Sequence, residues 1–134
     1  MSDSNPILLA YSGGLDTSFC IPWLKAQYDR PVITVTVDTG GIDADTAKAL
    51  ESRALQLGAM EHHQIDARAD FFNNVLRYLI AGNVKRGQSY PLCVGAERGV
   101  QAATMARIAV ETSASAIAHG CTAAGNDQVR IEVA

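Results

Sequence analysis

The sequence PILLAYSGGLDTS, residues 6–18, passes from an apolar strand through a glycine turn into a helix. Residues 6–11 are apolar on both faces, which is typical of a strand buried in the middle of a parallel sheet. Gly13 and Gly14 form the turn, and the helix is expected from about Asp16 to Gln27. A buried strand joined in this way to a helix is the repeating unit of α/β proteins.

The rest of the chain repeats this alternation. Further strands are expected at residues 32–37, 61–65 and 115–119, with the more polar 61–65 strand near an edge of the sheet. Helices are expected from Asp43, which suits an N-cap, over residues 71–80 and 96–112, and from Gln128 onward. The pattern predicts one α/β domain over residues 1–134, with an open parallel sheet, helices on both faces and a Rossmann-like arrangement.

Composition narrows the class of protein. The chain is 48% hydrophobic and 19% charged, as in ordinary globular domains, and its net charge of -3 argues against a nucleic-acid partner. No apolar run is long enough to span a membrane, so no membrane partner is expected. Three cysteines without a CxxC pair read as free thiols in a reducing compartment, which makes the cytoplasm the expected location.

The glycine turn has the properties of a phosphate-binding loop. Gly13 and Gly14 let the backbone approach an anion closely, and the N-terminus of the following helix points amides at it. Ser12, Thr17 and Ser18 add hydroxyl donors, whereas Asp16 makes sense beside phosphates if it helps to hold Mg²⁺. The chain has neither GxxxxGK[ST] nor GxGxxG. The alternative interpretation is a glycine turn capped by a serine.

Two segments resemble one enzyme family. Residues 10–18, AYSGGLDTS, resemble the pyrophosphatase loop of the ATP-pyrophosphatase (adenine nucleotide alpha-hydrolase-like) superfamily, in the form found in argininosuccinate synthase. Residues 119–122, HGCT, and 125–130, GNDQVR, resemble the signature of that same family. The resemblance implies an ATP-dependent ligase that joins citrulline and aspartate through a citrullyl-adenylate, releases AMP and pyrophosphate, and serves arginine biosynthesis.

The resemblance also assigns roles to residues, with ATP and Mg²⁺ as cofactors and no protein nucleophile. The nucleotide-binding positions are Ala10, Tyr11, Ser12, Gly13, Gly14, Leu15, Asp16, Thr17, Ser18, Val37 and Gly120, with Asp16 positioning Mg-ATP. Thr122, Asn126 and Asp127 match positions that bind aspartate, and Tyr90, Asn126 and Arg130 match positions that bind citrulline.

The sequence departs from the family pattern at two places. Ala123-Ala124 stands where the family usually has a lysine, and Val94-Gly95 replaces a polar Thr-Ser pair, although Arg98 keeps its place. The chain also reads as cut short, without the C-terminal synthetase and oligomerisation domain through which the full-length protein is expected to form a homo-oligomer. Two alternatives therefore stay open: an ATP-pyrophosphatase acting on another acceptor, including tRNA modification, and an ATP-binding module without turnover.

Overall fold

A four-stranded parallel sheet forms the centre of the molecule. The computed structural model describes residues 5–122 and 126–133. The strands are β1 (Ile7–Ala10), β2 (Val32–Asp38), β3 (Glu61–Asp66) and β6 (Ala116–Ala118), and they lie in the order β3-β2-β1-β6. Every pairing in this sheet is parallel, with Ile7 opposite both Val32 and Ala116. The predicted parallel sheet, the internal position of the first strand and the edge position of the third are confirmed.

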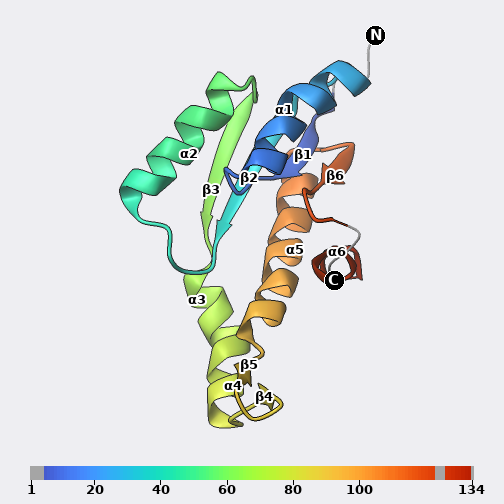
Figure 1. Cartoon of the computed structure of the whole chain (residues 1–134). Helices are drawn as coiled ribbons and strands as arrows, with labels where there is room; N and C mark the ends of the chain where they lie inside the picture. Colours follow the sequence, from blue (N-terminus) through green and yellow to red (C-terminus); the bar gives the residue numbers. More distant parts are fainter. Residues whose placement is uncertain (1–4, 123–125, 134) are drawn as a thin grey trace.

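Helices cover both faces of this sheet, as predicted. On one face, α1 (Leu15–Tyr28) and α2 (Ala44–Gln56) pack Ile21 and Ala54 against Leu9 of β1. On the other face, α5 (Cys93–Glu111) packs Met105 and Ile108 against the opposite side chains of β1 and β2. The last helix, α6 (Asn126–Val133), lies beside α5, and Figure 1 shows it nearly end-on.

The start of α2 follows the local sequence signal. Asp43 is the N-cap, and its carboxylate accepts a hydrogen bond of 2.7 Å from the amide of Thr46. This bond satisfies one of the amides that a helix N-terminus leaves without an intrahelical partner. The N-cap predicted from the sequence is confirmed.

The segment between β3 and α5 differs from the prediction. Instead of one regular helix over residues 71–80, it forms α3 (Arg68–Phe71), a π-helical turn (Phe72–Leu76) and α4 (Arg77–Ala81). A hairpin of β4 (Lys85–Arg86) and β5 (Tyr90–Pro91) follows, which the sequence did not reveal. This end of the molecule extends beyond the sheet (Figure 1).

The apolar side chains of this segment are buried to different degrees. Phe71 is buried, whereas Phe72 and Ile80 are half or more exposed. Also, α5 starts at Cys93 rather than near residue 96, which places Gly95 inside the helix. Across residues 5–122 and 126–133, no helix has the combination of length and hydrophobicity that a membrane crossing requires.

Candidate functional site

A cavity of about 470 Å³ opens at the carboxyl ends of β1, β2 and β6. Its volume is in the range of small-molecule sites, and this edge of an open α/β sheet is where ligands bind. Its walls include six of the predicted nucleotide-binding residues: Ala10, Tyr11, Ser12, Thr17, Val37 and Gly120. Side chains from α2, α5 and α6 complete the walls, with Leu50, Met105 and Ile131 among them.

The glycine loop presents the N-terminus of α1 to this cavity. Gly13 has a φ of 74°, a conformation that glycine adopts without strain, and a Cβ there would collide with the Leu50 side chain. Gly14 is the N-cap of α1 and offers no side chain to accept from the first-turn amides. These amides and the positive end of the helix dipole are thus available to an anion.

Hydroxyl groups hold the loop in shape. The Oγ of Ser12 lies 3.2 Å from the Oγ1 of Thr17 and accepts from the amide of Gly14 at 3.4 Å. Ser18 is buried, and its Oγ lies 3.5 Å from the Tyr11 hydroxyl. Ser12 and Thr17 therefore face the cavity, whereas Ser18 faces the core.

The two predicted motifs meet directly. A Cβ at Gly120 would lie 2.8 Å from the Cγ2 of Thr17, so the segment after β6 approaches α1 as closely as a glycine allows. Beside this contact lies a second hollow of about 530 Å³, whose walls include Leu15, Asp16, Gly120 and Thr122. Two segments far apart in the sequence thus build one continuous surface around the start of α1.

Few side chains at this site could bind a metal ion. Asp16 is exposed in the first turn of α1, and in the described part of the chain no three His, Cys, Asp or Glu side chains group as metal ligands. A lone carboxylate suits Mg²⁺ only where phosphate oxygens supply further ligands, which is how Mg²⁺ commonly binds with nucleotides. Asp16 beside the free amides of α1 fits such a Mg-nucleotide rather than a permanently bound metal.

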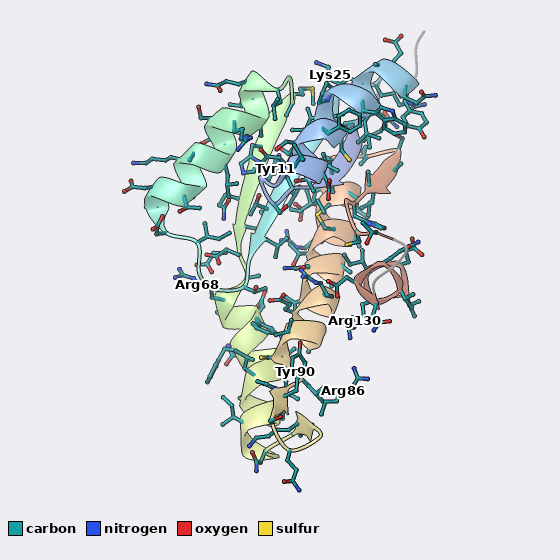
Figure 2. All side chains as sticks on the ribbon, in the orientation of Figure 1. Tyr11, Lys25, Arg68, Arg86, Tyr90 and Arg130 are labelled. Atoms are coloured by element: carbon teal, nitrogen blue, oxygen red, sulfur yellow. The ribbon has the colours of Figure 1, made fainter. Side chains whose placement is uncertain are left out.

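The predicted amino-acid-binding residues lie outside this cavity. Asn126, Asp127 and Arg130 are on α6, whereas Tyr90 is on the β4–β5 hairpin and is half-exposed. Figure 2 places Tyr90 and Arg130 well away from Tyr11 beside the glycine loop. Of the residues predicted to bind aspartate or citrulline, Thr122 alone borders either hollow. Residues 123–125, including Ala123-Ala124, lie outside the described residues. The roles of these residues stay predictions.

Asp127 lies between two arginines. Its carboxylate accepts a hydrogen bond of 2.9 Å from Arg130 and lies 3.4 Å from Nη2 of Arg98. The hydrogen bond from Arg130, with the charges of both arginines, lowers the pKa of Asp127 below its ordinary value. The Arg130 guanidinium also lies 3.3 Å from the point where a Cβ of Gly95 would be. Gly95, one of the departures from the family pattern, thus makes room for Arg130.

His119 and Cys121 both border the site, and both have structural partners. His119 Nδ1 accepts from the Cys121 amide at 3.3 Å, and its Nε2 lies 3.5 Å from a carboxylate oxygen of Glu132 on α6. Burial raises the pKa of the Cys121 thiol, so the thiol stays protonated at neutral pH. Cys121 is thus a partly buried thiol that is not activated as a nucleophile.

Several cavity residues were missed from the sequence. Asp38 is buried at the end of β2, where its carboxylate accepts a 2.8 Å hydrogen bond from the Gly40 amide. Its place directly after Val37 at a strand's carboxyl end was a usable signal. Arg98 also borders the cavity, and its Nε is buried without an acceptor among the described residues. For Met105 and Ile131 no signal existed, because apolar residues on a helix read as ordinary core.

Comparisons with known proteins identify the family to which this chain is similar. Residues 6–134 match the family model described as the arginosuccinate synthase N-terminal HUP domain. Argininosuccinate synthases of Staphylococcus haemolyticus and Xylella fastidiosa are 47% and 45% identical to the chain, over 96% and 100% of its length. The enzyme of Sulfurisphaera tokodaii is 44% identical over 96% of the chain. The chain spans about a third of the length of these curated relatives, or 31%, 33% and 32% respectively.

Solved structures support the fold. An NH3-dependent NAD synthetase from Campylobacter jejuni superposes with a TM-score of 0.62 at 11% identity, over 86% of this chain and 47% of that one. The NAD+ synthetase of Burkholderia pseudomallei superposes with a TM-score of 0.51 at 19% identity, over 84% of this chain and 44% of that one. At such low identity the similarity concerns the fold alone.

Proposed function

Because the chain belongs to the argininosuccinate synthase family, whose N-terminal HUP domain it matches over residues 6–134, we propose that it is the ATP-binding part of an AMP-forming ligase. The reaction we propose for the complete protein joins citrulline and aspartate in arginine biosynthesis. Its partners are then small-molecule substrates rather than nucleic acids or membranes. We further propose that the full-length protein is a homo-oligomer in the cytoplasm, where its three free cysteines would stay reduced.

One observation carries this proposal: the glycine loop and the segment after β6 meet at Thr17 and Gly120, on the wall of the cavity. In the proposed complex, the first amides of α1 bind the β- and γ-phosphates of ATP. The base lies against the apolar part of the wall, where Val37 and Met105 are. Asp16 holds Mg²⁺ together with the phosphates, and the ion neutralises phosphate charge there.

The chemistry we propose depends on alignment. The ureido oxygen of citrulline attacks the α-phosphorus of ATP, and pyrophosphate leaves. The aspartate amine then attacks the resulting adenylate, and AMP leaves. In this proposal, the side chains of this domain hold reactants in line and spread the developing charge over backbone amides, and none forms a covalent bond with substrate.

The direct test has two stages. Calorimetric titration with Mg-ATP should show binding to the 134-residue chain. AMP and pyrophosphate are then measured with citrulline and aspartate, for this chain and for a chain extended through its natural C-terminus. We expect turnover only from the extended chain, because Tyr90, Asn126 and Arg130 lie outside the cavity and supply only part of an amino-acid pocket.

The outcomes separate the competing functions. A folded chain that does not bind Mg-ATP would overturn the proposal. Binding with no turnover in the extended chain would indicate an ATP-binding module. Pyrophosphate release that requires an acceptor other than citrulline would indicate a different substrate. The test includes this outcome because Gly95 departs from the family pattern.

A further inference from the structure

Arg98 connects the cavity wall to the start of α6. It lies in the second turn of α5, and its side chain is largely buried, with 27% of its surface exposed. Its Nη1 donates to the side-chain oxygen of Gln101 at 2.8 Å, which holds the guanidinium against its own helix. Its Nη2 lies 3.4 Å from the Asp127 carboxylate on α6. One planar side chain thus joins two helices that are separate in the sequence.

Glu97, the residue before Arg98, connects α5 to the loop after β2. Glu97 accepts a 3.2 Å hydrogen bond from the hydroxyl of Thr39, which follows β2, and lies 3.6 Å from Arg98. A chain of polar contacts therefore runs from the loop after β2, across α5, to α6. It passes along the cavity, since both Thr39 and Arg98 form part of its wall.

The helix that Arg98 reaches needs such an anchor. Helix α6 has only eight residues, and helices this short are not stable in water without tertiary contacts. The hydrogen bond between Arg130 and Asp127 joins two residues of α6 itself, so it cannot fix the helix relative to the sheet. Apart from the Arg98 contact, one other contact within salt-bridge distance joins α6 to the rest of the described residues, the 3.5 Å approach of His119 Nε2 to a carboxylate oxygen of Glu132.

We propose that Arg98 is a positioning residue for the amino-acid half of this site. Its guanidinium holds the Asp127 carboxylate, and with it the N-terminus of α6, beside the cavity. This inference rests on the proposed function, in which Asn126 and Asp127 contact the amino-acid substrates. Positioning is decisive in a reaction that depends on alignment, because a displacement of about 1 Å can lower the rate on the order of a hundredfold. A lysine cannot replace Arg98 fully, since one ammonium cannot reach two acceptors with the planar fork of a guanidinium.

The test compares Arg98→Met and Arg98→Lys with a control on the same helix. Arg107→Met is that control, because Arg107 pairs with Glu111 on the exposed side of α5. Two measurements need no ligand: the pH titration of the Asp127 carboxyl by NMR, and hydrogen exchange of the α6 amides. A third uses the chain extended through its natural C-terminus and follows L-aspartate binding through the shifts of the Thr122 and Asn126 amides.

In Arg98→Met we expect an upward shift of the Asp127 titration, faster exchange in α6 and several-fold weaker aspartate binding. Arg98→Lys should keep much of the lowered pKa of Asp127 but less of the protection of the α6 amides from exchange. It replaces the methionine variant in the test if that variant does not fold. Arg107→Met should match the wild type in all three. Wild-type titration and exchange in both Arg98 variants would overturn the inference. A wild-type extended chain that binds no aspartate would instead count against the proposed function, while the two ligand-free measurements still decide the role of Arg98.

Discussion

Replacing Gly14 with valine should separate phosphate binding from folding. Gly14 has φ -71° and ψ 173°, an extended conformation that valine adopts readily. The nearest atom to a Cβ at this position is the Ser12 Oγ, at an ordinary contact distance of 3.4 Å. The folded state therefore has room for the new side chain, and we expect the free energy of unfolding to fall by no more than about 1 kcal/mol, because valine is a poorer N-cap than glycine.

Nucleotide binding should respond quite differently. The branched side chain would stand at the N-cap of α1, where we propose that phosphate oxygens approach the amides. Losing one charge-assisted hydrogen bond costs about 1.5 to 3 kcal/mol, which corresponds to a roughly 10- to 150-fold increase in Kd. The assay is calorimetric titration with Mg-ATP, alongside urea unfolding of the same preparation.

A matched comparison comes from the neighbouring glycine. Gly13→Val should destabilise the fold, because Gly13 has a positive φ and its Cβ would collide with Leu50. A Gly14→Val protein with wild-type stability and wild-type affinity for Mg-ATP would refute the reasoning, because the nucleotide would then have to bind elsewhere.

Three further predictions concern stability. Gly120→Ala should lower the free energy of unfolding by about 1 to 3 kcal/mol in urea titrations, because the new methyl would overlap Thr17; unchanged stability would contradict the observed close approach. Gly99→Ala should raise it by about 0.8 to 1 kcal/mol, since alanine favours the interior of α5 and no atom lies within 4 Å of its Cβ; a lower urea midpoint would be the contrary result. The hydrogen bonds from Arg68 lower the pKa of Asp66 to about 2 in the folded state. The contribution of the Asp66 carboxylate to stability is therefore present above the unfolded pKa of about 4 and is lost as the pH falls from there towards 2. The stability gap between wild type and Asp66→Asn should close over that range in acid unfolding curves, and a constant gap would exclude this origin.

Local signals in the sequence were sufficient for most of the fold. The apolar run at residues 6–11, the β-branched run at 32–37 and the Asp43 cap depend mainly on residues close in sequence, and the structure has all three. The internal position of β1 and the edge position of β3 also follow, because a strand that is apolar on both faces needs neighbours on both sides, and polar residues such as His62 and His63 suit an edge. The loop at residues 12–18 was recognisable for the same reason, since glycines, hydroxyls and a helix start are adjacent along the chain.

The tertiary structure decided what depends on distant residues. No local pattern shows that Gly120 touches Thr17, that Arg130 lies over Gly95, or that Arg98 reaches Asp127. Likewise, Phe72 and Ile80 have the spacing of buried residues yet are exposed, because burial depends on whether another element lies opposite them. A sequence records chemical type and spacing, which indicate most of the elements and the ligand chemistry expected of a loop such as residues 12–18. The meeting of two elements depends on the packing of the whole sheet, and that packing brings Thr17, Val37 and Gly120 to one cavity while leaving Tyr90 outside it.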